Sequence, residues 1–332
     1  MSSDAEKLRL AQNLLQELGL RWSDVASPRA VPTISGYLPR VVAAATPAQR
    51  DKYATYWNRA ELLHGDWRLD ELRTSDILAL QQESTGSALR RSNNRHGRHA
   101  GEGCIRAMRF LYRLAVADGL ISSGANPANR APLPRRLPNL RRALTTGELA
   151  EIYDAAYNGG NDVVLDALLL RLHVETACRR GGALALSMND LDETLCSLRL
   201  REKGGTVRMQ PISRTLCSAL LTHARCRGAV SPTDQLLRYA NHSPLTSRRY
   251  DHLWSRVRTA LPWAAKLGVS THWLRHTTLT WVERNYGYGI ARAYAGHTDT
   301  KGCSTLTYIK GVPSEVATAL SALTGEPHPL AR

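Results

Sequence analysis

Apolar residues recur at helical spacing along nearly the whole chain, and this periodicity restricts the fold more than any other feature of the sequence. The apolar stripes run through residues 1–20, 34–45, 48–64, 74–83, 102–118, 146–157, 162–176, 213–226, 246–260, 274–285 and 314–324. Residues 196–213 instead alternate apolar and polar positions on both sides of Gly204-Gly205, as the strands of a β-hairpin do. We therefore predict a mainly α fold with a small β-hairpin or sheet, an α+β fold with little strand content.

The charge balance predicts a polyanionic partner. The 332 residues include 44 Lys or Arg and 29 Asp or Glu, a formal net charge of +15, and 38 of the cations are arginines. Guanidinium groups bind phosphate through paired donors at fixed geometry, so such an excess is typical of nucleic-acid binding. Hydrophobic residues make up 43% of the chain, which is too much for a disordered polyelectrolyte.

Several functional classes are not expected. The six cysteines have no C-x-x-C spacing, no His pair complements them as zinc ligands, and no glycine-rich phosphate loop is present. We therefore expect neither a metal site nor a nucleotide cofactor. No apolar run approaches the roughly 20 residues of a membrane span, and the N-terminus resembles no signal peptide. We expect a cytoplasmic, nucleoid-associated protein.

Prolines and shifts of charge predict four segments. We expect an N-terminal helix and linker at 1–30, a helical domain at 31–121, a basic Pro-rich linker at 122–142, and a second domain at 143–332 with a last helix at 313–324. The linker contains no acidic residue, and its composition predicts a stiff, extended strap that would suit a protein closing around a duplex.

Ten arginines in two clusters are candidate DNA contacts. They are Arg90, Arg91, Arg95, Arg98, Arg106 and Arg109 in a loop and its following helix, and Arg135, Arg136, Arg141 and Arg142 in the linker. Their density, with Glu102 as the one acid near the first cluster, favours a phosphate-contacting surface. A solvated face and an ordinary interdomain linker remain the alternatives.

In the second domain, cations, imidazoles and a phenol recur at breaks between predicted elements, where side chains from several elements can converge. They are Arg179 and Arg180 before Gly181-Gly182, Lys203 at the hairpin tip, His272, Arg275 and His276 at a helix start, His297 after Gly296, and Tyr308 before the last helix. Each signal alone is common, and a single His more often caps a helix or lies in a core. The choice between Arg179 and Arg180 stays open. The ordered set is the informative feature.

Five segments in this order resemble the motif boxes of the tyrosine site-specific recombinases, the phage integrase family. They are TACRRGGALALSMNDLD, KGGTVRMQPI, HWLRHTTLTW, AGHTD and LTYIKG. Upstream, IRAMRFLYRLAVADGLISSGANPA resembles the end of that family's helical core-binding domain. The resemblance covers about residues 31–325. It implies an actinobacterial-type integrase that lacks a separate arm-binding domain and in which a core-DNA-binding domain (31–121) and a catalytic domain (143–332) form a C-shaped DNA clamp.

The resemblance also implies a role for each matched residue. Arg179 and Arg275 would bind the phosphate, Lys203 would protonate the departing 5′ oxygen, His272 would act as base, His297 would donate a hydrogen bond to the phosphate, and Tyr308 would be the nucleophile. DNA would then be cleaved and rejoined through a 3′-phosphotyrosyl intermediate without metal or ATP. Strand exchange would need a homotetramer on two double-stranded DNA sites, formed from monomers or dimers in solution.

The sequence departs from the family pattern at two points. Gly182 stands where the family has an acidic residue, and Glu175 is a possible substitute. The loop from His297 to Tyr308 is longer than usual, which leaves Tyr294 as a second candidate nucleophile.

Two further choices stay open at this stage, the packing of the last helix and the function. The apolar face of the last helix, with Val312, Val316, Leu320 and Leu323, is predicted to dock on a neighbouring protomer rather than in its own core. A DNA-binding regulator on a recombinase scaffold and a type IB topoisomerase-like enzyme are the alternative functions.

Overall fold

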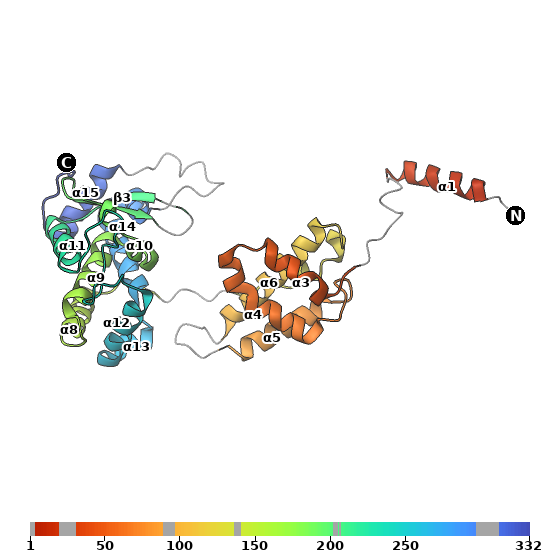
Figure 1. The fold of residues 1–332 in the computed structure, drawn as a ribbon, viewed down its shortest axis with the longest axis horizontal. Helices are drawn as coiled ribbons and strands as arrows, with labels where there is room; N and C mark the ends of the chain where they lie inside the picture. Colours follow the sequence, from red (N-terminus) through yellow and green to blue (C-terminus); the bar gives the residue numbers. More distant parts are fainter. Residues whose placement is uncertain are drawn as a thin grey trace. The chain divides into compact units, whose positions relative to one another are not determined.

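The chain folds into two compact units, Met1–Leu137 and Pro138–Arg332 (Figure 1). The computed structural model describes residues 4–19, 31–88, 97–135, 141–201, 205, 207–296 and 312–332. The division falls within the segment 122–142. Both units are mainly helical, as predicted, and among the described helices none combines the length and apolar composition that crossing a bilayer requires.

The first unit is helical, and its apolar core is formed by residues between Ile34 and Ala131. Its longer helices are α1 (Asp4–Glu17), α3 (Ile34–Ala44), α4 (Pro47–His64), α5 (Thr74–Gly86) and α6 (Arg98–Ala117). The core has two fully buried aromatic side chains whose polar atoms are satisfied: Trp57 Nε1 donates to the carbonyl of Ala107 at 3.1 Å, and the Tyr112 hydroxyl donates to the carbonyl of Leu69 at 3.0 Å. These bonds remove the cost of burying the indole N–H and the phenol.

The Pro-rich segment is not extended throughout, so this prediction is wrong over 123–125 and 127–130. A 3-10 turn, η1 (Ser123–Ala125), leads into the short helix α7 (Pro127–Arg130), for which Asn126 is the N-cap. Pro127 occupies the first helical position, where its missing N–H costs nothing. Ala128 and Ala131 are fully buried in the core of the first unit.

The second unit is larger. It contains α8 (Thr146–Tyr157), α9 (Val163–Thr176), α10 (Arg180–Leu184), η2 (Met188–Asp190), β1 (Leu191–Asp192), β2 (Ser197–Arg201), β3 (Val207–Pro211), α11 (Arg214–Cys226), α12 (Ser247–Ala260), α13 (Pro262–Leu267), α14 (Thr271–Ala295) and α15 (Pro313–Thr324). Helix α9 is apolar on nearly all sides and is the central helix of this unit, since most of its residues are buried.

The predicted hairpin is confirmed. Strands β2 and β3 pair antiparallel from Ser197 opposite Pro211 to Arg201 opposite Val207, and β1 adds a third strand beside β2. The alternation has a clear physical basis: Leu198 and Leu200 are buried, whereas Arg199 and Arg201 lie on the other face and pair with buried Asp190 at 2.9 and 2.7 Å. The two-residue strand β1 is too short to give a periodic signal.

Helix α14 runs further than the predicted 274–285. It begins at Thr271 and continues to Ala295 through a kink at Gly287, whose φ of 83° is outside the helical range. A residue without a Cβ adopts this conformation at little cost, so two helical segments join there. The apolar pattern changes face at the kink, which explains why the periodicity predicted an earlier end.

The last helix packs within its own unit, contrary to the predicted docking on a neighbour. Val316, Ala319 and Leu320 of α15 are buried in one cluster with Val282 and Tyr294 of α14. The segment that follows also contacts the second unit, because Glu326 accepts a hydrogen bond from the Thr215 backbone N–H at 3.1 Å.

Candidate active site

A sharp turn at the end of α9 places Arg179. Ala177 closes the helix with a φ of 48°, in the left-handed region that residues with a Cβ enter at a cost of roughly 1 kcal/mol or more. The chain then becomes extended, and Arg179 (φ −80°, ψ 152°) is the N-cap of α10. Helix α10 runs through the Gly181-Gly182 pair.

His272 and Arg275 come from the first turns of α14, one turn apart on the same side of the helix. Arg275 is 4% exposed. It donates one hydrogen bond to the carbonyl of Ala177 and another, of 2.8 Å, to the carbonyl of Ala295. Arg275 thus joins the end of α9 to the end of α14, directly before Gly296 and His297.

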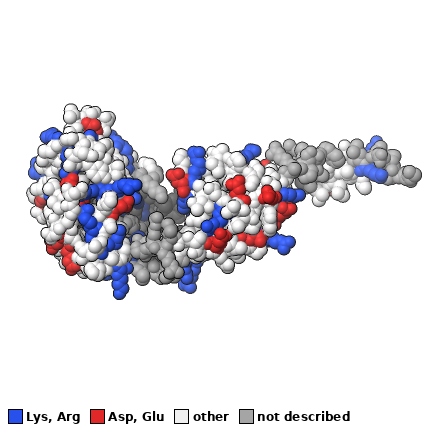
Figure 2. Space-filling view, turned by 60° about the horizontal axis from the view of Figure 1, so that its bottom comes forward, with Lys and Arg blue, Asp and Glu red and all other residues white. Residues whose placement is uncertain are grey.

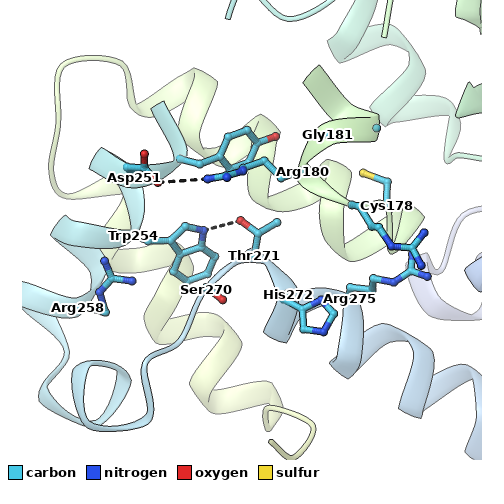
Figure 3. Close-up of a pocket in the computed structure, with 13 residues that line it drawn as sticks. Cys178, Arg180, Gly181, Asp251, Trp254, Arg258, Ser270, Thr271, His272 and Arg275 are labelled. Atoms are coloured by element: carbon cyan, nitrogen blue, oxygen red, sulfur yellow. Dashed lines mark hydrogen bonds and ion pairs between the residues drawn. The ribbon is translucent and has the colours of Figure 1, made fainter. Parts of the chain in front are cut away.

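Arg179, His272 and Arg275 meet around one cavity. The cavity has a volume of about 590 Å³, and a second one of about 310 Å³ shares the same three residues. In Figure 3 the His272 and Arg275 side chains lie side by side, and dashed lines mark the Arg180–Asp251 and Trp254–Thr271 contacts of residues that line the same pocket. The structure therefore brings three of the six predicted catalytic residues together.

The surroundings of His272 favour its neutral form. Burial by surrounding protein atoms lowers the pKa of the imidazole, and the positive charges of Arg141, Arg275, His276 and Arg179 lower it further. A neutral imidazole can accept a proton at neutral pH, which a general base must do. Arg141, predicted as a DNA contact, acts on this site from the segment before α8.

The surroundings of Arg179 and Arg180, between which sequence analysis left the choice open, favour Arg179 as the catalytic candidate. Arg180 is exposed and pairs with Asp251 at 3.2 Å. It lines the larger cavity but not the smaller one, whereas Arg179 lines both cavities. Sequence reasoning missed Asp251, a carboxylate on α12 that lies on the wall of the larger cavity. No motif marked it, because its place in the site depends on the packing of α12.

Glu175 is not the substitute for the acidic residue missing at Gly182. The residue is 4% exposed, and its carboxylate accepts hydrogen bonds from Arg171 Nε at 2.7 Å, from the Ser213 backbone N–H at 2.9 Å and from the Ser213 hydroxyl at 3.0 Å. These bonds join α9 to the start of α11, so the carboxylate of Glu175 has a structural role.

Tyr294 is poorly placed for the nucleophilic role that sequence analysis left open. Its side chain is fully buried, and its hydroxyl donates to the backbone carbonyl of Glu175. Burial raises the pKa of the phenol, so the phenolate that attacks phosphorus would be hard to form. We conclude that Tyr294 packs the core.

Other predicted site residues lie outside the described part of the chain. They are Lys203, His297 and Tyr308 of the catalytic set, and Arg90, Arg91, Arg95 and Arg136 of the DNA-contact set. The structure does describe the elements on either side of the three catalytic candidates. Strands β2 and β3 lead to and from Lys203, α14 ends just before His297, and α15 begins shortly after Tyr308.

The described candidate DNA contacts differ in their surroundings. Arg98 and Arg135 are exposed, whereas Arg106 pairs with Glu102 at 2.8 Å. Arg109 donates to the carbonyls of Ala128 and Ala131 at 3.2 and 2.8 Å, which ties α6 to α7.

Arg142 is exposed and pairs with Glu148, which lowers the pKa of that carboxyl to about 2. Figure 2 shows many basic side chains on the face of the second unit turned toward the viewer. Within the described ranges, no three His, Cys, Asp or Glu side chains gather as metal ligands would.

The fold of this chain is similar to that of solved DNA integrase structures. The structure of a lambda integrase dimer bound to a COC′ core site aligns with a TM-score of 0.62 over 93% of this chain and 81% of that one, at 18% identity. The Tn1549 transposon integrase in complex with circular intermediate DNA aligns with a TM-score of 0.64 over 86% and 98%, at 15% identity.

The model of the phage integrase family matches residues 142–310, just over half of the sequence, and the chain belongs to this family. It is 30% identical over 190 residues to tyrosine recombinase XerD of Mycobacterium leprae, a match that covers 52% of this chain and 58% of that protein. It is 25% identical over 206 residues to tyrosine recombinase XerC of Pseudomonas entomophila, covering 62% and 68%. The chain thus spans somewhat less than two thirds of the length of the mycobacterial relative.

Proposed function

We propose that this protein is a site-specific DNA recombinase, a tyrosine recombinase that cleaves and rejoins DNA without metal or ATP. The observation that carries the proposal is the meeting of Arg179, His272 and Arg275 around one cavity inside the segment that matches the family. The names of the related proteins support it, since XerD and XerC are tyrosine recombinases and the lambda integrase structures contain DNA.

The two arginines would stabilise the charge that develops on the phosphate. A phosphodiester resists attack because its negative charge repels nucleophiles and its alkoxide is a poor leaving group. Arg179 and Arg275 would donate hydrogen bonds to the non-bridging oxygens. A guanidinium has five N–H groups, so Arg275 could bind a phosphate oxygen in addition to the two carbonyls it contacts.

In the proposed cleavage step, the bonds formed and broken balance without a cofactor. The phenolic oxygen of Tyr308 would form a bond to phosphorus while the bond from phosphorus to the 5′ oxygen breaks. His272 would take the phenolic proton, Lys203 would give a proton to the departing oxygen, and His297 would donate to the phosphate. The resulting 3′-phosphotyrosyl link keeps the energy of the phosphodiester, so a 5′ hydroxyl of another strand can reverse the step.

Recombination requires double-stranded DNA and several copies of the chain. We propose that residues 31–121 and 143–332 act as core-binding and catalytic domains, enclose the duplex as a C-shaped clamp, and assemble as a tetramer on two sites in the nucleoid. A solved structure of a lambda integrase tetramer bound to a Holliday junction supports this arrangement by analogy of fold. Arg98 and Arg135, both exposed, are the described side chains best placed to contact phosphates by this reasoning.

The direct test is covalent trapping on a suicide duplex nicked near the exchange site. The proposal predicts a covalent adduct whose peptide map assigns the link to a tyrosine. Nuclease protection of a site without any adduct would favour the DNA-binding regulator. Relaxation of supercoiled DNA that lacks a paired site would favour topoisomerase-like activity.

Replacing either cavity arginine by Ala is expected to slow cleavage, but the two variants should differ in stability. Loss of one donor to the developing charge costs roughly 10²–10³-fold in rate. Arg275→Ala also leaves the carbonyls of the buried residues Ala177 and Ala295 without this donor, at about 1–3 kcal/mol per unsatisfied group. Arg179 is more exposed than Arg275, so Arg179→Ala should cost less.

Single-turnover cleavage and urea unfolding measure the two effects separately. Equal stability of Arg179→Ala and Arg275→Ala would contradict the structural role given to Arg275. Wild-type cleavage by Arg179→Ala would remove Arg179 from the catalytic set.

Affinity for DNA is expected to fall steeply with salt. The slope of log K against log salt should be about −0.9 per phosphate neutralised, so Arg98→Gln should make it less steep by about 0.9. Arg225→Gln is the matched control, because Arg225 is also exposed but pairs with Glu193 at 3.0 Å outside both predicted contact clusters. An affinity independent of salt would refute the inference from charge.

A further inference from the structure

Helix α12 contacts the segment that leads into His272 at two points. Trp254 Nε1 donates to the hydroxyl of Thr271 at 2.7 Å, and Arg258 donates to the carbonyl of Val269 at 3.2 Å. Trp254 and Arg258 are four residues apart and therefore lie on the same side of α12. We call these two residues the α12 pair. Figure 3 shows Trp254 beside Thr271, with His272 next along the chain.

This contact is well shielded from water. Trp254 is 4% exposed, Thr271 is 8% exposed and Val269 is fully buried. A hydrogen bond between buried groups is costly to break, because the indole N–H and the hydroxyl would lose their partners without gaining water.

The start of α14 needs such support. Its N-cap, Ser270, makes no side-chain hydrogen bond to the helix. An N-cap bond ordinarily fixes the first turn of a helix and contributes about 1 kcal/mol. Here the α12 pair holds the residues on both sides of Ser270, so α12 takes over the role that the cap does not perform.

Helix α12 is itself fixed to the helix that positions Arg179. The Tyr250 hydroxyl lies 2.9 Å from His173 Nε2 on α9, and Arg249 pairs with Asp166 of α9 at 2.6 Å. Since α9 ends in the turn before Arg179, the packed pair of α9 and α12 supports both the side of the cavity with Arg179 and the side with His272.

We propose that Trp254 and Arg258 are positioning residues that hold His272 in register with Arg179 and Arg275. The proposal rests on the function proposed above for the role of His272 in cleavage, although the placement of the imidazole can be tested without DNA. None of the five segments that resemble the family's motifs lies in α12.

The electrostatic surroundings of His272 give a sensitive readout of its position. The charged and titratable groups that act on it are Arg141 before α8, Arg179 before α10, and Arg275 and His276 on its own helix, and all of them lower the pKa of the imidazole together with burial. An imidazole released from this position would be better solvated and further from the cations. Its pKa would then rise toward the ordinary value.

The test compares four variants of the full chain. Thr271→Val removes the acceptor at nearly constant shape, Trp254→Phe removes the donor, and Thr271→Ser keeps the hydroxyl. Trp263→Phe is the matched control, since Trp263 Nε1 donates to Glu151 at 2.6 Å away from the cavity. The pKa of His272 is measured by NMR on histidine-labelled protein, with the signal assigned through His272→Gln, and single-turnover cleavage is measured on the suicide duplex.

We expect the His272 pKa to rise in Thr271→Val and Trp254→Phe and to stay at the wild-type value in Thr271→Ser and Trp263→Phe. Cleavage should slow about 10- to 100-fold in the first two, because a displacement of about 1 Å can cost that much. Thr271→Ser should cleave within about threefold of wild type.

Other outcomes overturn the proposal. A lower melting temperature with an unchanged His272 pKa in both folded variants would show a purely structural contact. Unchanged cleavage in Thr271→Val and Trp254→Phe would also show that the contact is purely structural. If Thr271→Val does not fold, Trp254→Phe decides alone. Absence of cleavage by wild type would refute the proposed function instead, and the NMR measurement would still decide the position of His272.

Discussion

Replacing Tyr308 by Phe is expected to abolish the covalent protein–DNA adduct while DNA binding stays intact. The substitution removes one oxygen, the atom that would bond to phosphorus, and leaves the aromatic ring in place. The second candidate, Tyr294, is a poor substitute, since it is fully buried with its hydroxyl bonded to a carbonyl. The measurements are adduct formation on the suicide duplex and a gel-shift titration.

Tyr294→Phe is the matched control for this prediction. It should form the adduct at the wild-type rate within a few-fold and lose about 1 kcal/mol of stability, the usual effect of one lost hydrogen bond. Adduct formation by Tyr308→Phe would assign the nucleophile elsewhere. Loss of the adduct in a folded Tyr294→Phe variant, with Tyr308→Phe active, would restore Tyr294 as the nucleophile.

Asp166→Ala is expected to lower the free energy of unfolding by about 3–5 kcal/mol, the typical cost of leaving buried charges unpaired. Asp166 is fully buried on α9 and accepts hydrogen bonds from two arginines of α12: Arg249, through Nε at 2.7 Å and a terminal nitrogen at 2.6 Å, and Arg256. Arg249 is only 5% exposed, so its guanidinium could not gain enough water in return. Chemical denaturation of the full chain measures the loss.

The matched control is Glu193→Ala, which breaks the pair with Arg225. Both side chains of that pair are more than half exposed, so the loss should stay below about 1 kcal/mol. A similar, small loss in both variants would contradict the account of the α9–α12 contact. Because α12 also supports His272, Asp166→Ala should slow cleavage even under conditions where it remains folded.

Local patterns predicted most of the helices and the site motifs. The helical stripe at 146–157 is confirmed as α8, and its start is fixed by a capping box in which the Glu148 N–H donates to the Thr145 hydroxyl at 3.1 Å. The hairpin was predicted from alternation around Gly204-Gly205 and is confirmed. These features depend on residues close together in the chain, which is why the sequence contains enough information to predict them.

Other features depend on contacts between distant residues. The helix at Pro127–Arg130 forms because Ala128 and Ala131 find a place in the core and their carbonyls accept from Arg109, whereas local composition favoured an extended strap. Helix α15 buries its apolar face against α14 in the same unit, a choice between partners that an amphipathic pattern alone does not make.

The sequence by itself determined which chemical groups this protein has: an excess of arginine, and an ordered set of Arg, Lys, His and Tyr at the breaks between elements. Only the tertiary structure decided how the described groups are held, with Arg275 joining the ends of α9 and α14 and α12 supporting the residues beside His272. The physical reason is that each residue of the sequence specifies its own side chain directly. The distance between groups far apart in the chain is set by the packing of whole helices.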